Sequence, residues 1–334
     1  MRKTYAAKLR NVLNASITNG RLSEILNELS ADELEFISHD WELWARDEQL
    51  APVLIAQDSR NKPAPCGRLP AGESQGAIKS WRVWLLLGGR GSGKTRAGAE
   101  WVRSLALSSE TDEATSPLTA AGSRNASRRE QPRIALVGKT LADVRNVMIE
   151  GQSGLLAIHP AKERPLFEPS KRRLTWPNGA VAELFSADEA EALRGPQFTA
   201  AWCDELAKWR GAERAWDMLQ FALRLGEAPR VCVTTTPRAT KLLKQIIADE
   251  ATVTVNLATA DNATNLAPTF LAEMTRRYAG SAIGRQELLG EIVEDPSDGL
   301  WRRHWIEEAR VENAPEMQRV VVALDPPVTA FAVS

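Results

Sequence analysis

The sequence predicts an α/β fold in which a mainly parallel sheet is covered by helices on both faces. Short, continuous apolar runs recur along the chain, and segments with helical periodicity separate them. This alternation is typical of parallel sheets, because parallel strands need crossover connections and are buried on both faces. The runs that predict strands lie at residues 83–87, 133–137, 198–203, 230–235, 252–257 and 320–324.

The first part of the chain, residues 1–55, is predicted to be a helical N-terminal segment. Apolar residues between 22 and 29 recur at helical spacing, and Ser30 stands where the N-cap of a further helix is expected. Residues 56–80 are rich in Pro, Gly and Ser, which predicts an insertion loop before the first strand.

A core domain is predicted over residues 81–260. Its first strand leads into a helix over 93–107, and the polar stretch 108–132, which has no periodicity, predicts a surface insertion. Pro177-Asn178-Gly179 lies between two strand-like runs and predicts a hairpin. Further helices are predicted over residues 141–149, 214–225 and 241–249.

Beyond the core, residues 261–318 are predicted to form a helical linker subdomain with helices over 268–278 and 283–289. The last strand-like run lies within residues 319–334, which we interpret as the start of another domain.

Composition excludes several classes of protein. The 334 residues carry a net charge of −1, which gives no global basic field for nucleic acid. Three cysteines and three histidines, without ligand spacing, make a disulfide framework or a zinc site unexpected and favour a reducing cytosol. No apolar run has the length of a membrane span, so no membrane partner is expected.

A phosphate-binding loop is the strongest motif. Residues 88–95 match GxxxxGK[ST] directly after a strand and before a helix, which makes a chance match in a glycine-rich turn a weak alternative. Backbone amides of such a loop surround phosphate oxygens, the lysine reaches the β- and γ-phosphates, and the hydroxyl ligates Mg²⁺. The predicted nucleotide-binding residues are Gly88, Gly89, Arg90, Gly91, Ser92, Gly93, Lys94 and Thr95.

The acidic half of the site is predicted at Asp204 and Glu205, at the carboxyl end of a neighbouring strand. Asp204 would orient Mg²⁺ with Thr95, and Glu205 would activate water as the general base. A solvated acidic pair at a strand end is the alternative. An adjacent Glu is typical of ATP-driven P-loop NTPases of the ASCE type, and no guanine-reading motif is present, so ATP is favoured over GTP.

Three hydroxyls, Thr234, Thr235 and Thr236, end the next strand. We expect them beside the phosphates, where they could transmit loss of the γ-phosphate, although threonine also simply suits strand ends. Two arginines are candidates for stabilising transition-state charge. They are Arg90 in the loop and Arg194, which could act in cis, reach a neighbouring subunit, or be an ordinary surface residue.

Four segments together resemble the large terminase subunit, the ATP-driven DNA-packaging motor of tailed phages, and in particular its branch in gene transfer agents and related prophages. They are LLLGGRGSGKTRAGAEW, PSKRRLTWPNGA, LRGPQFTAAWCDELAKW and VTTTPR, in that order. The resemblance implies that residues 88–95 are Walker A, that Asp204 and Glu205 are Walker B and the catalytic glutamate, and that residues 234–236 are the coupling motif.

Other expectations also come from this resemblance. Gln49 resembles the glutamine that reads adenine in such motors, with an exposed polar side chain as the alternative. The implied partners are double-stranded DNA, a portal protein, a small terminase subunit and other copies of the chain in a ring, in the cytoplasm of a bacterial host. Basic residues at 171–173 and 276–277 are candidate DNA contacts or merely a solvated charged face.

The family also has an RNase H-like nuclease domain that binds two metals, and VVVALDPPVT resembles its first strand, with Asp325 as a metal ligand. One carboxylate cannot hold two metals, so we expect a truncated nuclease domain and no nuclease activity in this chain. Two other hypotheses remain. One is a different P-loop translocase, such as a helicase, and the other is a non-catalytic prophage remnant.

Overall fold

The computed structural model describes residues 22–52, 81–108 and 131–293, with a few isolated positions near both ends of the chain. Two compact units are present, residues 1–294 and residues 295–334, and the first contains all the elements discussed below. Most of both predicted insertions lies outside the described residues, as do the predicted strand 320–324 and Asp325.

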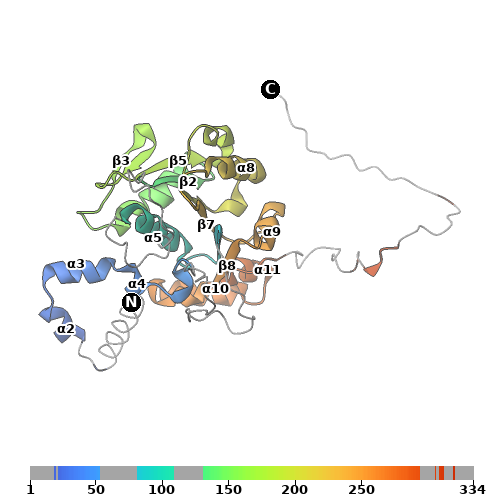
Figure 1. The fold of residues 1–334 in the computed structure, drawn as a ribbon. Helices are drawn as coiled ribbons and strands as arrows, with labels where there is room; N and C mark the ends of the chain where they lie inside the picture. Colours follow the sequence, from blue (N-terminus) through green and yellow to red (C-terminus); the bar gives the residue numbers. More distant parts are fainter. Residues whose placement is uncertain are drawn as a thin grey trace, which may run out of the picture. The chain divides into compact units, whose positions relative to one another are not determined.

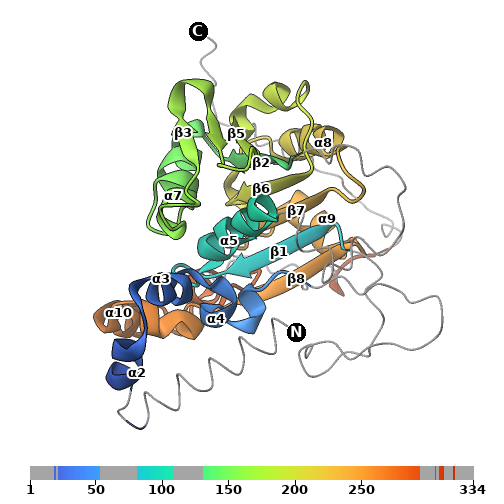
Figure 2. The same cartoon turned by 60° about the vertical axis from the view of Figure 1, so that its left-hand side comes forward.

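Eight strands form one sheet in the order β3-β4-β5-β2-β6-β7-β1-β8 (Figures 1 and 2). From β5 to β8 every neighbouring pair is parallel, and β3 and β4 add an antiparallel edge, so the predicted mainly parallel sheet is confirmed. The strands are β1 (Val83–Gly88), β2 (Arg133–Gly138), β3 (Leu166–Glu168), β4 (Arg173–Thr175), β5 (Val181–Ser186), β6 (Ala200–Asp204), β7 (Arg230–Thr235) and β8 (Thr252–Leu257).

Helices cover both faces of this sheet, as predicted. Helix α5 lies on one face of the sheet, and α8 and α9 lie on the other (Figure 2). Side chains of α5 pack with the Trp84 face of β1, and side chains of α8 and α9 pack with the opposite, Leu85 face. Successive β1 residues thus enter two separate cores, which explains why the strand is apolar throughout. The helices are α5 (Lys94–Leu107), α6 (Leu141–Asp143), α7 (Leu155–Ile158), α8 (Ala212–Ala222), α9 (Lys241–Ala248), α10 (Pro268–Tyr278) and α11 (Ala282–Gly284).

The N-terminal segment contains α2 (Leu22–Glu28), α3 (Ala31–His39), α4 (Trp41–Trp44) and the 3₁₀ turn η1 (Asp47–Gln49). The predicted helix start at Ser30 is confirmed. Its hydroxyl caps the Glu33 amide, and the Glu33 carboxylate accepts a bond from the Ser30 amide at 2.9 Å. None of the helices in the described residues has the length and apolar character required to cross a membrane.

Some local predictions differ from the structure. The helix predicted over 141–149 is a short α-helix followed by a π-helix, η3 (Val144–Ile149), and the one predicted over 283–289 likewise ends in a π-helix, η8 (Arg285–Leu289). Strand β3 has only three residues, of which Leu166 is exposed, so it lacks the apolar run that marks the other strands. The 3₁₀ segments η5 (Ala187–Leu193) and η6 (Leu206–Lys208) lie on either side of β6.

The strand order corrects one expectation about the site. Asp204 does not end a strand next to the phosphate-loop strand, because β7 lies between β6 and β1. In the register of these parallel strands, Thr234 pairs with Asp204 on one side, and Thr235 pairs with Leu87 on the other. All three strands end at the same edge of the sheet, and their functional residues therefore converge there.

Candidate active site

The phosphate loop follows β1 directly and ends where α5 begins at Lys94. Gly91 and Gly93 have φ angles of 71° and 87°, which glycine adopts without a steric penalty. Lys94 is buried, and its ammonium group donates to the Gly89 carbonyl at 3.1 Å and lies 3.6 Å from the Glu205 carboxylate. The loop and the acidic strand are thus connected through the predicted phosphate-binding lysine.

Asp204 is 7% exposed at the end of β6. Its Oδ1 accepts a hydrogen bond from the Thr234 hydroxyl at 2.6 Å. Burial raises the pKa of this carboxyl to about 6, and the negative charge of Glu205 adds to the effect. The site thus disfavours an isolated negative charge at Asp204. A cation bound beside Asp204 would favour the ionised carboxylate again.

Glu205 has a φ of 51°, in the left-handed region that few residues other than glycine adopt. Its carboxylate accepts hydrogen bonds from the Thr236 amide at 3.2 Å and the Thr236 hydroxyl at 3.3 Å, and pairs with Lys208 at 3.1 Å. Burial by itself raises the pKa of Glu205, but Lys94, Lys208 and these hydrogen bonds outweigh burial and lower it. Glu205 is therefore ionised at neutral pH, as a general base must be.

Thr234 and Thr235 end β7, Thr236 follows it, and all three contact the acidic segment. The Thr234 hydroxyl accepts from Trp202 Nε1 at 2.9 Å while it donates to Asp204. The Thr235 hydroxyl accepts from the Ala207 amide at 3.1 Å, and Thr236 binds Glu205. All three residues are at most 1% exposed. Their side chains therefore act on the site through their hydrogen bonds to the acidic segment.

Gln49 is 5% exposed, which excludes the exposed alternative. Its Nε2 donates to the Gly93 carbonyl at 3.2 Å, and its Oε1 accepts from the Arg46 amide at 3.2 Å. The structure therefore places Gln49 against the phosphate loop, with both ends of its amide bonded within the protein.

Mg²⁺ is the metal that the sequence predicts at Thr95 and Asp204. Carboxylate and hydroxyl oxygens are the hard donors that Mg²⁺ prefers. No group of three or more His, Cys, Asp or Glu residues suited to a metal exists in the described part of the chain. The Thr95 hydroxyl and the Asp204 carboxylate fit Mg²⁺, which is commonly held by one or two protein oxygens together with phosphate oxygens.

A family model for the N-terminal part of the terminase large subunit, T4likevirus-type, matches residues 85–308. The chain belongs to the terminase large subunit family. The match includes the phosphate loop, the acidic pair and the threonines at residues 234–236, so these features of the terminase sit on a P-loop NTPase fold. The comparison with curated protein sequences gives no match.

Several solved large terminases are similar in structure to this terminase. One from a thermophilic bacteriophage, in complex with ADP, has 15% identity and a TM-score of 0.47, over 64% of this chain and 49% of that chain. The HK97 bacteriophage protein has 18% identity and a TM-score of 0.45, over 64% and 47%. The Thermus phage P74-26 ATPase domain has 14% identity and a TM-score of 0.43, over 63% and 88%. The matched region is thus about half of each of the first two chains.

The two candidate arginines of the terminase have different surroundings. Arg90 Nε donates to Glu287 Oε2 at 2.7 Å, and the side chain is 69% exposed. Arg194 is 71% exposed and pairs with Glu191 at 3.2 Å, which Arg214 also binds. Arg194 therefore belongs to a surface cluster, and its contacts do not include the phosphate loop.

Sequence reasoning missed three residues that complete this site. Lys208 pairs with Glu205, Trp202 binds Thr234, and Glu287 binds Arg90. Lys208 could have been found, because it stands one helical turn after Glu205. Glu287 is 197 residues from Arg90 in sequence, and no local pattern connects the two.

Proposed function

We propose that this terminase chain is the ATP-hydrolysing motor part of a machine that translocates double-stranded DNA into a procapsid. The observation that carries the proposal is the contact set of Glu205. Its carboxylate lies 3.6 Å from the phosphate-loop ammonium of Lys94 and accepts both hydrogen bonds from Thr236. The candidate base Glu205 thus contacts both the lysine of the phosphate loop and the residue that directly follows β7.

The roles of the residues follow from these contacts. Lys94 and the loop amides would bind the β- and γ-phosphates, and Thr95 and Asp204 would hold Mg²⁺, whose charge lowers the cost of phosphoryl transfer. Ionised Glu205 would accept a proton from the attacking water. The large terminase of the thermophilic bacteriophage was solved with ADP and with ATP-gamma-S, and the same class of ligand is proposed here.

Coupling to movement would pass through Thr236. A change in the position or charge of Glu205 during hydrolysis alters its two hydrogen bonds with Thr236. The next residue is Pro237, which begins the connection to α9. The proposed route therefore runs from the hydrolysis site to α9.

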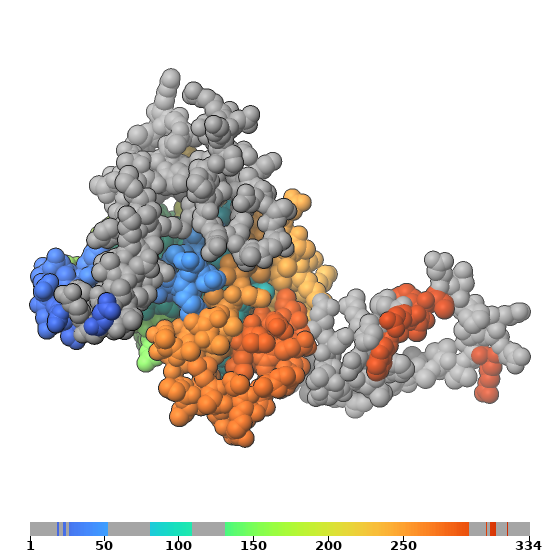
Figure 3. Space-filling model, turned by 90° about the horizontal axis from the view of Figure 1, so that it is seen from below, coloured from blue at the N-terminus to red at the C-terminus, as the bar shows by residue number. Residues whose placement is uncertain are grey.

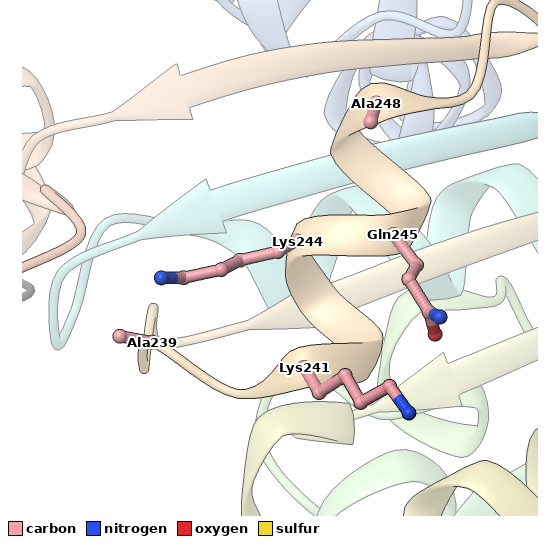
Figure 4. Close-up of a pocket in the computed structure, with 5 residues that line it drawn as sticks. All are labelled: Ala239, Lys241, Lys244, Gln245 and Ala248. Atoms are coloured by element: carbon pink, nitrogen blue, oxygen red, sulfur yellow. The ribbon is translucent and has the colours of Figure 1, made fainter. Parts of the chain in front are cut away.

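Contacts to DNA are proposed on the outer face of α9. The basic residues first considered, 171–173 and 276–277, form surface ion pairs with neighbouring glutamates. Arg238 and Lys241 are exposed, and within the described residues neither takes part in an ion pair. A shallow pocket on this face is lined by Ala239, Lys241, Lys244, Gln245 and Ala248 (Figure 4). The unneutralised charges of Arg238 and Lys241 suit phosphate contacts that do not depend on the base sequence of the DNA.

The partners proposed for this motor are those that the family implies. They are a portal protein, a small terminase subunit and other copies of the chain in a ring, in the cytoplasm of a bacterial host. Arg194 lies on the surface, where it could act on a neighbouring copy.

The test is steady-state ATP hydrolysis with and without double-stranded DNA, comparing the parent chain with Glu205→Gln. A general base contributes about 10²- to 10⁴-fold, so the variant should lose at least about a hundredfold in kcat while still binding ATP. Glu213→Gln, at an exposed glutamate on α8, is the matched control and should keep its activity.

Turnover of the parent chain no higher than that of Glu205→Gln would overturn the proposal and favour a non-catalytic remnant. A forked DNA duplex incubated with the chain and ATP tests the other alternative, a helicase. Separation of its strands would identify a helicase, whereas a packaging motor should be stimulated by fully paired DNA and leave the strands paired.

A further inference from the structure

Side chains bind five successive carbonyl groups of the phosphate loop, from Gly89 to Gly93. Lys94 belongs to the loop itself, and the other four donors come from segments outside it. The bonds are Lys94 Nζ to Gly89 O (3.1 Å), Thr259 Oγ1 to Arg90 O (2.8 Å), Asn262 Nδ2 to Gly91 O (2.7 Å), Arg46 Nη2 to Ser92 O (2.6 Å) and Gln49 Nε2 to Gly93 O (3.2 Å). We call the four outside donors, Arg46, Gln49, Thr259 and Asn262, the carbonyl belt.

The belt determines which way the loop amides point. A peptide group is planar and trans, so its carbonyl and its amide point in opposite directions. The carbonyls of residues 90–93, which the belt binds on the outer side, therefore turn the amides of residues 91–94 toward the inner, phosphate side. The Gly89 carbonyl is bound by Lys94 instead, and the Arg90 amide that follows it donates to the Glu287 carbonyl. An array of inward amides forms an anion site, and it binds best when the array need not be ordered during binding.

The belt joins two parts of the chain that are distant in sequence. Arg46 and Gln49 come from the N-terminal segment, and Thr259 and Asn262 follow β8. Arg46 Nη1 also donates to Asn262 Oδ1 at 3.0 Å, which connects the two sides across 216 residues. Figure 3 shows the light-blue end of the N-terminal segment against the orange residues that follow β8.

Backbone contacts anchor both the phosphate loop and the belt to η8. The Arg90 amide donates to the Glu287 carbonyl at 2.7 Å, and the Thr259 amide donates to the Leu288 carbonyl at 2.7 Å. This approach requires glycine at position 89, because a Cβ there would lie 2.4 Å from Thr259 Oγ1 and 2.6 Å from the Glu287 carbonyl. The linker backbone therefore rests directly on the loop.

We infer that Arg46, Thr259 and Asn262 are positioning residues for nucleotide phosphate binding, and that through them the nucleotide stabilises both the N-terminal segment and the linker. The inference rests on the proposed function, in which the loop binds ATP. Because coupling between two sites is reciprocal, a belt that favours phosphate binding must itself be stabilised when phosphate binds.

The test measures equilibrium binding of a fluorescent ADP and the kinetics of ATP hydrolysis for Asn262→Ala and Thr259→Val. Loss of one of these bonds should weaken ADP binding roughly tenfold and raise KM for ATP, with little change in kcat, because the belt does not contact the acidic pair. Thr264→Val is the matched control. It makes the same substitution at an exposed position of the same segment and should bind as the parent does.

Hydrogen exchange supplies a second measurement. In the parent chain, ADP should slow exchange over residues 44–50 and 258–266, and Asn262→Ala should lose much of this protection. Equal ADP affinity in Asn262→Ala, Thr259→Val and Thr264→Val would overturn the inference. A parent chain that binds no nucleotide would refute the proposed function. In that case, hydrogen exchange over residues 88–96 is compared between Asn262→Ala and the parent chain without nucleotide. Faster exchange in Asn262→Ala would support the role of the belt in ordering the loop, and unchanged exchange would overturn that role.

Discussion

Replacing Thr234 by valine tests how strongly the acidic strand depends on β7. The Thr234 hydroxyl donates to Asp204 Oδ1 at 2.6 Å and accepts from Trp202 Nε1 at 2.9 Å, and the side chain is fully buried. Valine keeps the shape of the side chain but leaves both partners without a hydrogen bond. Each buried polar group left unpaired costs about 1–3 kcal/mol, so the free energy of unfolding should fall by about 3 kcal/mol.

A matched control exists in the same sheet. Thr252 begins β8, and its hydroxyl is buried without a hydrogen-bond partner in the described part of the structure. Thr252→Val removes the same atom and no hydrogen bond, so its free energy of unfolding should stay within about 0.5 kcal/mol of the parent value. Urea unfolding followed by tryptophan fluorescence measures both variants. Equal stability of Thr234→Val and Thr252→Val would refute the reasoning.

Two further predictions concern pH and DNA. Burial lowers the pKa of His159 to about 4 from 6.5, so the neutral ring is favoured in the folded state. The difference in pKa corresponds to about 3 kcal/mol in the free energy of unfolding. This stabilisation should be complete above pH 6.5 and should be lost as the pH falls toward 4. Urea unfolding at pH 7, 5.5 and 4 should show this loss in the parent chain and not in His159→Gln, and equal pH slopes would contradict it. The charged groups around the ring are Arg103, Glu163 and Arg164. At the start of α9 and in the connection before it, joint replacement of Arg238 and Lys241 by glutamine should weaken DNA binding and reduce its salt dependence by about two phosphate contacts, whereas Arg276→Gln should change little. An unchanged salt slope would exclude α9 as a DNA contact.

The parts of the fold that the sequence predicted are those determined by local pattern. The phosphate loop needs glycines between a buried strand and a helix, and all of these are contiguous in residues 83–107. The Asp204–Glu205 pair was predictable because an apolar run ends there. These signals are local, and tertiary contacts did not have to be known to read them.

The rest of the site depends on contacts between distant segments. Arg46 and Asn262 reach the loop from segments 216 residues apart, and nothing in either local pattern indicates a phosphate site. The position of β7 between β1 and β6 is a property of sheet order, which the lengths of the connections do not determine. The expected role of Gln49 as an adenine reader stays a prediction, as does the action of Arg194 on another subunit.

The central place of β7 in the sheet limits how the strand can move. The strand is hydrogen-bonded along both edges, to β1 on one side and β6 on the other. A slip of one residue would break both ladders and turn Thr234 to the opposite face of the sheet. Longitudinal sliding of the strand is therefore costly. Under the proposed function, β7 would act as a stationary support, and displacement would begin after the ladder ends, in the residues that connect β7 to α9.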